Sequence, residues 1–370
     1  MDMPSRICVV GLGLIGGSLA ADLRGVHWVD QVVGYDVDAS VVRRAVKLGL
    51  VDVCAGGGLA DAVAGCGLVI VAVPVGSIAT VTREAMAGAP PGALVTDVGS
   101  VKAQLVAEVE CAMPVGARFV GGHPMAGAED CGVGAARRGL FKGAAYVLTP
   151  TGNTDPEALA VMSKVATSVG AHVMIMGPAA HDEIVAVVSH VPQVAATALM
   201  NAALDEMKSR PAGGALAAGG FRDMTRIAGS GPEIWSHILT GNSSEIGRVL
   251  EVFEERLGRL RRAIRERDEG AIWREMERAR SGRAVMIEVG DTAGSEQVQV
   301  VAEGDLRNLG EALTAAGEAG VGLADLDLRR LRGRERPDGR VVLTTLSSKQ
   351  AALASEHLES RGFRVRLRGQ

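Results

Sequence analysis

The sequence predicts three consecutive regions: an α/β region built on a doubly wound sheet, an all-helical region, and a small βαββαβ module. Short apolar strands alternate with helical stretches up to residue 178, strand patterns are missing from 179–290, and they return within 296–370. Apolar strands separated by helices are what a parallel sheet covered on both faces requires. We therefore expect three domains, at 1–178, 179–290 and 296–370.

Composition limits the class of protein. The chain has 370 residues, 47% of them hydrophobic and 22% charged, with a formal net charge of −4, as in an ordinary soluble protein of two or three domains. Charges along 254–283 alternate in sign, which indicates a solvated helix face and argues against a nucleic-acid partner. No uncharged apolar run approaches the roughly 18 residues of a membrane span, so we expect no membrane partner. Five cysteines without a C-x-x-C pair, and no secretion leader, predict a cytoplasmic protein with reduced thiols and no metal.

The first expected strand, 6–10, runs into a glycine turn and then a helix. Such a turn lets the backbone approach a pyrophosphate, whose charge is met by the free N–H groups of the helix N-terminus. This arrangement is typical of the Rossmann fold, so we expect a Rossmann-like domain that binds a dinucleotide. The expected contacts in the turn are Gly11, Gly13, Leu14, Ile15 and Gly16.

The second expected strand, 31–35, ends at Asp36, which lies roughly 20 residues past the glycines, where a ribose-binding acid is expected. A carboxylate there accepts hydrogen bonds from the ribose 2′-hydroxyl and repels a 2′-phosphate, which favours NAD over NADP. The alternative is that Asp36 only caps the following helix. Arg43 and Arg44, two helical turns further on, leave the strictness of the cofactor choice open.

Later strands are expected at 68–73, 93–97, 118–120, 146–149 and 171–176. Ligands of doubly wound sheets bind beyond the carboxyl ends of the strands. Val73 with Pro74, Ser100 and His123 all stand at such ends, so we expect them to converge on one crevice. Ser100 either donates to a substrate hydroxyl or caps the helix that follows it.

His123 is the candidate for proton transfer. It stands among glycines and a proline in the run 120–129, and the unperturbed pKa of histidine lies near neutrality, so it suits a base that takes a proton as a hydride moves. The pattern predicts a dehydrogenase. The alternative is a loop histidine that only satisfies a turn.

Helical patterns dominate the middle region, from 181 through 204, at 234–239 and at 246–267. An all-helical half that follows a nucleotide-binding half usually supplies a substrate pocket and a dimer face, so we expect a homodimer that acts on a small molecule.

Five motifs occur in order: G-L-G-L-I-G-G-S at 11–18, D-V-G-S-V-K at 97–102, G-H-P-M-A-G-A-E at 122–129, H-D-E-I-V-A-V-V-S-H-V-P-Q at 181–193, and G-G-F-R-D-M-T-R-I-A at 219–228 with Trp235. In these motifs, over roughly residues 6–285, the chain resembles the prephenate dehydrogenases of tyrosine biosynthesis. The resemblance implies NAD-dependent oxidation of a ring hydroxyl carbon coupled to decarboxylation, which turns prephenate into 4-hydroxyphenylpyruvate. The family also contains arogenate dehydrogenases, which give tyrosine directly.

The resemblance also implies roles for individual residues. His123 would accept the proton of the substrate C4 hydroxyl, and Ser100 would bond near the same oxygen. Arg226 would clamp a substrate carboxylate, because a guanidinium offers it paired donors; the alternative is a surface arginine beside Asp223. The other residues expected to line the substrate pocket are Glu129, Ser189, His190 and Gln193.

Three positions carry open alternatives. His190 is either a pocket residue or a satisfied histidine between helices, and His181 with Asp182 matches the family but also suits a helix start. Many relatives have a second histidine where this chain has Gln193, a position expected to face the substrate side chain. Because glutamine cannot be charged, the sequence does not separate prephenate from arogenate.

The last region follows a ferredoxin-like order and resembles an ACT regulatory domain, with a linker at 290–295. Tyrosine feedback is the functional hypothesis for it, and ligand-free oligomerisation is the alternative. The segment 303–310 replaces the acidic-Arg-Pro-Gly turn expected after the first strand of such a domain. The expected strands are 296–301, 323–331, 341–346 and 363–367, the helices are 308–319 and 349–360, and a hairpin turn is expected at 336–340.

Two other functions predict different residues. A β-hydroxyacid dehydrogenase would have a catalytic lysine on the first helix of the second half, and 181–205 contain none. A non-catalytic NAD-binding sensor would keep the glycine turn and lose the site, but this chain has His123, Ser100 and Arg226.

Overall fold

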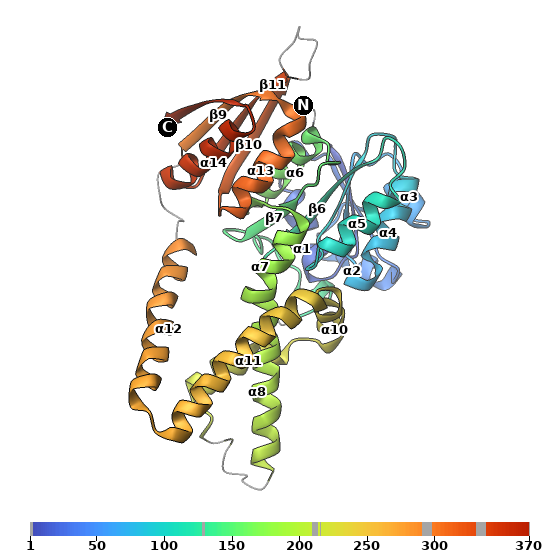
Figure 1. Cartoon of the computed structure of the whole chain (residues 1–370). Helices are drawn as coiled ribbons and strands as arrows, with labels where there is room; N and C mark the ends of the chain where they lie inside the picture. Colours follow the sequence, from blue (N-terminus) through green and yellow to red (C-terminus); the bar gives the residue numbers. More distant parts are fainter. Residues whose placement is uncertain are drawn as a thin grey trace. The chain divides into compact units, whose positions relative to one another are not determined.

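The computed structural model describes residues 3–127, 130–208, 214, 216–290, 298–330 and 338–369. The chain divides into two compact units. The first, here called the sheet unit, comprises Met1–His181 and Ser295–Gln370, and the second, the helical unit, comprises Asp182–Gly294. Figure 1 shows helices packed on both faces of the N-terminal sheet, and long helices in the helical unit.

The first strands of the sheet unit are parallel and have the order β3-β2-β1-β4-β5-β6. This is the strand order of a dinucleotide-binding doubly wound sheet, as the alternation of apolar strands and helices predicted. The short strand β3 was not predicted, because two residues leave no apolar pattern. These strands are β1 (Arg6–Val10), β2 (Gln31–Tyr35), β3 (Val53–Cys54), β4 (Leu68–Val71), β5 (Leu94–Asp97) and β6 (Arg118–Pro124), and the helices are α1 (Leu14–Leu23), α2 (Ala39–Lys47), α3 (Leu59–Val63), α4 (Val75–Gly88), α5 (Ala103–Cys111) and α6 (Pro156–Ser168).

Strand β6 is longer than predicted, and this changes the setting of His123. The sequence suggested that the strand ends at Val120 and that His123 lies in a loop, whereas β6 continues to Pro124 and includes His123. The reason is that β7 (Ala145–Thr149) returns antiparallel to β6 and pairs with its last four residues, with His123 opposite Val147. Strand β8 (His172–Ile175) then runs parallel to β7, so the sheet is mixed and not wholly parallel.

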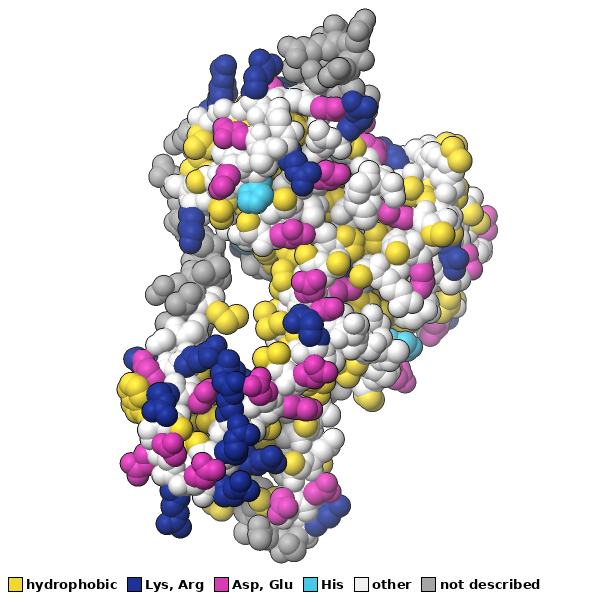
Figure 2. All heavy atoms as spheres, viewed as in Figure 1, with side chains coloured by type: hydrophobic (Ala, Val, Ile, Leu, Met, Phe, Trp, Pro, Cys, Tyr) yellow, Lys and Arg dark blue, Asp and Glu magenta, His cyan; other side chains and the backbone are white. Residues whose placement is uncertain are grey.

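The helical unit contains the long helices expected of it. Its small core includes Ala186, Val191 and Ile246. Figure 2 shows Lys and Arg side chains gathered with Asp and Glu over this unit, and ion pairs such as Arg256 with Glu275 join α11 and α12. The elements are α7 (Pro178–Val185), the π-turn η2 (Ala186–His190), α8 (Val191–Met207), α9 (Gly219–Thr225), the 3-10 turn η4 (Arg226–Gly229), α10 (Pro232–Gly241), α11 (Ser243–Glu266) and α12 (Glu269–Gly290).

One helical run of the described residues, Pro178–Met207, is long and apolar enough to cross a membrane by length and composition alone. The run includes Asp182 and Glu183, and the core helix of a soluble protein meets the same criteria. It is therefore weak support for a membrane span.

The C-terminal residues form a βαββαβ succession with the strand order β12-β9-β11-β10, all antiparallel. Each predicted strand and helix is present within a few residues of its expected place. The predicted linker lies largely in residues outside the described ranges. Of the hairpin turn predicted at 336–340, residues 336–337 lie outside the described ranges, and 338–340 form the start of β11 (Asp338–Thr345). The elements are β9 (Val298–Asp305), η5 (Leu306–Asn308), α13 (Leu309–Glu318), β10 (Gly322–Arg330), β11 (Asp338–Thr345), α14 (Ser348–Ser360) and β12 (Arg364–Gly369).

This C-terminal module continues the N-terminal sheet. Leu323 of β10 pairs antiparallel with Val173 of β8, so the described strands form one sheet of 12. Lys164 of α6 forms an ion pair with Asp327 of β10, with Nζ and Oδ1 3.5 Å apart. At Gly317 of α13, a Cβ atom would overlap the carbonyl oxygen of Ile175. The module therefore packs on β8 with no space for a side chain at that point.

The close approach at Gly317 gives a first prediction. Gly317→Ala places a methyl group against a backbone carbonyl that cannot rotate away, so we expect the free energy of unfolding to fall by about 1–3 kcal/mol, the usual cost of overpacking. The measurement is denaturant unfolding together with limited proteolysis of the C-terminal module. Gly310→Ala on the same helix is the control, because a Cβ there would lie 3.6 Å from the Thr151 carbonyl oxygen, an ordinary contact. Equal stability of the two variants would contradict the predicted contact.

Candidate active site

The glycine turn after β1 is shaped for a ligand that approaches its backbone. Gly11 has a φ of 90°, and a Cβ there would overlap the carbonyl oxygen of Ala72, while a Cβ at Gly16 would overlap the carbonyl oxygen of Gly11. Gly13 differs, because nothing lies within 4 Å of its Cβ position. Gly13 is the N-cap of α1 and has no side chain with which to cap that helix end. The turn thus presents backbone N–H groups and open space, which fits a pyrophosphate.

The neighbouring predicted contacts lie around this turn. Leu14 and Ile15 form the first turn of α1, where Leu14 is buried and Ile15 half-buried. Val73 Cγ1 would lie 3.1 Å from a Cβ at Gly11, and Pro74 is the N-cap of α4. The carboxyl ends of β1 and β4 therefore bring these residues together.

Asp36 is bound to the glycine turn. Its Oδ2 accepts a hydrogen bond from the Leu12 N–H at 2.9 Å, and its Oδ1 accepts one from the Asp38 N–H at 3.0 Å. Helix α2 is capped by Asp38, which accepts from the Ser40 N–H, so the alternative that Asp36 caps this helix is wrong. The bond to Leu12 was missed by sequence reasoning, since it joins residues 24 positions apart.

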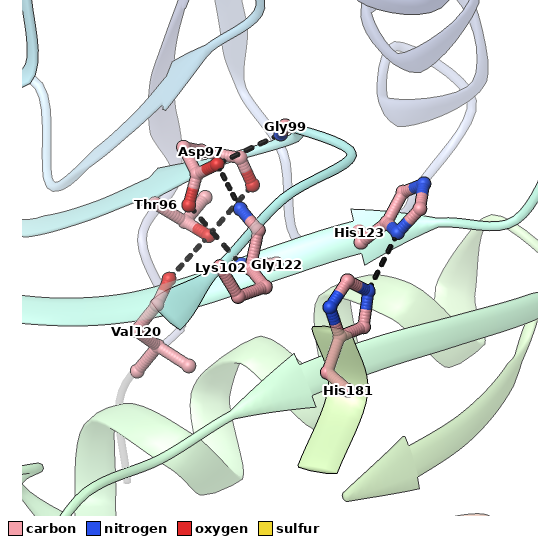
Figure 3. A network of polar contacts seen from close by, with 8 residues as sticks. All are labelled: Thr96, Asp97, Gly99, Lys102, Val120, Gly122, His123 and His181. Carbon is pink, nitrogen blue, oxygen red and sulfur yellow. Dashed lines mark hydrogen bonds and ion pairs between the residues drawn. The ribbon is translucent and has the colours of Figure 1, made fainter. Parts of the chain in front are cut away.

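His123 contacts a second histidine. His123 Nδ1 lies 2.8 Å from His181 Nε2, and the two rings meet edge to face at 69° with centroids 5.0 Å apart (Figure 3). Both rings are buried, with exposed fractions of 8% for His123 and 1% for His181. His123 lies in a strand and pairs with a ring from α7, so the loop-turn alternative is wrong. The sequence left His181 open between a family motif position and a helix start, and it did not predict this contact.

A buried ion pair lies beside these histidines. Asp97 at the end of β5 and Lys102 before α5 are both 0% exposed, and Lys102 Nζ pairs with Asp97 Oδ2. Asp97 also accepts hydrogen bonds from the Gly99 N–H at 2.7 Å and the Gly122 N–H at 3.3 Å. Asp97 therefore connects Gly99, which precedes Ser100, to Gly122, which precedes His123 in β6. Figure 3 shows these contacts around Asp97 and Lys102.

Close packing around Asp97 accounts for the glycines of the motif. A Cβ at Gly122 would lie 2.7 Å from the Asp97 carbonyl oxygen, and one at Gly121 would lie 2.5 Å from Thr149 Oγ1. Burial and the negative charge of Asp97 raise the pKa of Tyr146, which therefore stays protonated next to this carboxylate. These groups pack closely around Asp97, next to the strand that carries His123.

Ser100 is half-buried in the segment between β5 and α5. The N-cap of α5 is Lys102, so Ser100 is not the N-cap residue of this helix.

Ser189 and His190 lie in the π-turn that precedes α8. Pro192, two residues after His190, has no N–H to donate, which favours a local departure from α-helical bonding. Asn242 Nδ2 donates to the Asp182 carbonyl oxygen at 2.8 Å and lies 3.2 Å from His190 Nδ1. His190 also meets Trp235 edge to face, with ring centroids 6.1 Å apart. His190 is therefore buried, with contacts to Asn242 and Trp235, and its place in a substrate pocket stays a prediction.

Gln193 supports the turn that begins with Arg226. Gln193 is 4% exposed, and its Nε2 donates to the Ile227 carbonyl oxygen at 3.0 Å. Its Oε1 is buried and has no hydrogen-bond partner among the described residues. Arg226 is exposed at the start of η4. Glu129 lies outside the described residues.

The described sites therefore comprise a dinucleotide turn with a buried histidine pair in the sheet unit, and a polar cluster in the helical unit. Residues 19–175 match the family model described as prephenate dehydrogenase, nucleotide-binding domain. Residues 177–278 match the model described as prephenate dehydrogenase, dimerization domain. The chain belongs to the prephenate dehydrogenase family.

Known relatives agree with this family. Prephenate dehydrogenase of Bacillus subtilis is 34% identical over 283 residues, which are 76% of each chain. A solved prephenate dehydrogenase of Aquifex aeolicus, in complex with hydroxyphenyl propionate and NAD+, has a TM-score of 0.70 at 32% identity and covers 76% of this chain and 98% of its own. A solved Synechocystis arogenate dehydrogenase has a TM-score of 0.66 at 33% identity and covers 76% of this chain and 99% of its own.

The ion pair beside His123 gives a second prediction. Lys102→Met leaves the Asp97 carboxylate in a buried position without its cation, so we expect the free energy of unfolding to fall by about 3–5 kcal/mol. The measurement is equilibrium unfolding in denaturant. The double variant Asp97→Asn with Lys102→Met removes both charges and should recover a large part of the loss. A single variant as stable as the original protein, or a double variant no better than the single one, would show that the pair is not a stabilising constraint.

Proposed function

We propose that this protein catalyses the NAD-dependent oxidative decarboxylation of prephenate to 4-hydroxyphenylpyruvate. The observation that carries the proposal is the buried His123 ring, whose Nδ1 faces His181 while its other nitrogen points away from it (Figure 3). A base in that position, in the same unit as a dinucleotide turn, is what an alcohol oxidation requires. The names of the relatives and the NAD+ in the solved Aquifex relative support it.

The proposed reaction balances without any further reactant. NAD supplies the hydride acceptor for the hydrogen on C4 of the ring. The hydroxyl proton passes to a base as the C4 oxygen becomes a carbonyl, and the bond between C1 and the ring carboxylate breaks to release carbon dioxide. The electron pair of the broken C1–carboxylate bond makes the ring aromatic, and the C4 oxygen takes back one proton. Aromatisation drives the reaction, so the protein has to orient the substrate and accept a proton.

In this proposal His123 accepts the hydroxyl proton, and Ser100 donates a hydrogen bond near the same oxygen. Arg226 binds a substrate carboxylate through paired N–H donors. Ser189, His190, Gln193 and Glu129 are proposed as further substrate-binding residues.

The dinucleotide would lie along the glycine turn. The open side of Gly13 and the uncapped start of α1 suit the pyrophosphate, and Gly11 and Gly16 let the backbone close tightly beneath it. Leu14, Ile15, Val73 and Pro74 complete the contacts. Asp36 is half-buried and already accepts two backbone hydrogen bonds, which orient its carboxylate for the ribose hydroxyls and favour NAD over NADP.

Arogenate is the second candidate substrate, and one observation favours it. The buried Gln193 Oε1 has no partner among the described residues, although an unmade hydrogen bond of a buried oxygen is costly. Arogenate carries an ammonium group on its side chain, which is a donor, whereas the keto group of prephenate is an acceptor. An ammonium group would satisfy Gln193 and a keto group would not.

We also propose a cytoplasmic homodimer with three domains, 1–178, 179–290 and 296–370. The exposed apolar side chains of α11 and α12 support a partner of the same chain, since a second copy would cover them. Trp273 is 66% exposed and Phe253 is 42% exposed. The family model that matches this region is described as a dimerization domain.

The C-terminal module is proposed to be ferredoxin-like and related to ACT domains, with tyrosine as its effector. Its βαββαβ order and the antiparallel arrangement β12-β9-β11-β10 support the fold.

The proposed activity is tested by NADH formation. The purified protein, offered NAD with prephenate or arogenate separately, should form NADH with one or both. His123→Asn keeps a polar side chain of similar shape and should lower kcat by about 10²- to 10⁴-fold, the range for a lost general base. No turnover of either substrate, or full activity of the His123 variant, would overturn the proposal.

The Gln193 oxygen gives a test of substrate choice. Gln193→Met keeps the length of the side chain and removes its whole amide, that is, the Oε1 acceptor and the Nε2 donor to the Ile227 carbonyl oxygen. Any loss through the Arg226 turn is shared by both substrates, so kcat/KM for arogenate should fall about tenfold more than kcat/KM for prephenate, the cost of a lost hydrogen bond to a charged group. The value for prephenate should change much less. An equal loss for both substrates would mean that Gln193 acts only by supporting the Arg226 turn.

A further inference from the structure

The contact between His123 and His181 restricts the protonation of both rings. Their nitrogens lie 2.8 Å apart, which is hydrogen-bond distance. A hydrogen bond forms only when one nitrogen carries a proton and the other presents a lone pair, and a neutral imidazole has one of each. The tautomer of one ring therefore determines the tautomer of the other.

We infer that His181 is a positioning residue that keeps His123 in the tautomer able to act as a base; this inference rests on the proposed function. His123 Nδ1 faces His181, and Figure 3 shows Nε2 pointing away from it. To accept a proton at Nε2, the neutral His123 ring must carry its own proton at Nδ1. His181 Nε2 accepts that N–H, so His181 carries its proton at Nδ1.

The same contact suits the charged form of His123. When the hydroxyl proton reaches Nε2, the His123 ring becomes an imidazolium with both nitrogens as donors. The bond from Nδ1 to His181 Nε2 then becomes charge-assisted and stronger. Because the two rings are 8% and 1% exposed, little water can replace this acceptor. His181 would stabilise the product of proton transfer more than the starting state.

The contact also fixes the plane of the His123 ring. His123 comes from β6 and His181 from α7, two elements that reach this point from positions 58 residues apart. The edge-to-face angle of 69° leaves the His123 ring edge-on to its partner. Because the His123 ring is attached to β6 and contacts His181 of α7, its Nε2 keeps one orientation.

The test compares two variants at position 181. His181→Leu removes the acceptor, and we expect kcat to fall about ten- to a hundredfold, a part of what a general base contributes, with a small change in KM. His181→Gln offers an amide oxygen to the Nδ1–H and should recover most of that loss. His172→Leu on β8 makes the same kind of change at a half-buried histidine outside the site and should keep full activity.

A double variant separates positioning from a general structural role. Once His123→Asn has removed the base, adding His181→Leu should lower kcat no further, because His181 acts through His123. Unchanged kcat in His181→Leu, no recovery in His181→Gln, or a further loss in the double variant would overturn the inference. If His123→Asn keeps full activity, the proposed function itself fails, which is a different result.

The tautomers can also be measured in the unaltered protein. ¹⁵N spectra of enzyme labelled in its histidines should show both rings protonated at Nδ1 when they are neutral, with His181→Gln used for assignment. A neutral His123 protonated at Nε2 would overturn the inference even if the variants at position 181 do not fold.

Discussion

Asp97 and Lys102 form a charge pair wholly removed from water, and the local architecture of the sheet unit depends on it. A buried carboxylate is tolerated only when its charge is neutralised and its lone pairs accept hydrogen bonds. Lys102 supplies the charge, and the backbone N–H groups of Gly99 and Gly122 supply two bonds. Because Gly122 precedes His123 in β6, satisfying this carboxylate also fixes the strand that carries the proposed base. The need to neutralise and hydrogen-bond the buried Asp97 carboxylate thereby sets the position of the His123 backbone.

The histidine pair extends this constraint toward function. The ion pair holds the backbone of β6, and His181 contacts the ring of His123 from α7. The Rossmann half contributes the second requirement, a glycine turn whose open face at Gly13 suits an anion. A dinucleotide turn and an oriented base in one unit are what the oxidation of an alcohol needs. Membership of the prephenate dehydrogenase family gives these groups a specific substrate class.

Local patterns predicted most of the fold, because apolar strands, glycine turns and helix periodicity depend on residues that are close together in the sequence. The motif that contains His123 was also visible in consecutive residues. What it missed depends on contacts between distant residues: the extension of β6 by pairing with β7, the bond from Leu12 to Asp36, and the His181 partner of His123. The pairing of β8 with β10 joins residues from opposite ends of the chain and has no local signal. Lys102 was included in a motif, but its ion pair with Asp97 was not predicted, because nothing in the neighbouring residues indicates a buried cation.

The most direct test of the central claim is the ratio of carbon dioxide released to NADH formed during turnover of prephenate labelled with ¹⁴C in its ring carboxylate. Hydride transfer and loss of the carboxylate belong to one reaction in this account, so equimolar carbon dioxide and NADH are expected. NADH without labelled carbon dioxide would indicate a plain alcohol dehydrogenase. Carbon dioxide without NADH would indicate decarboxylation that does not use the dinucleotide, and either result would contradict the account.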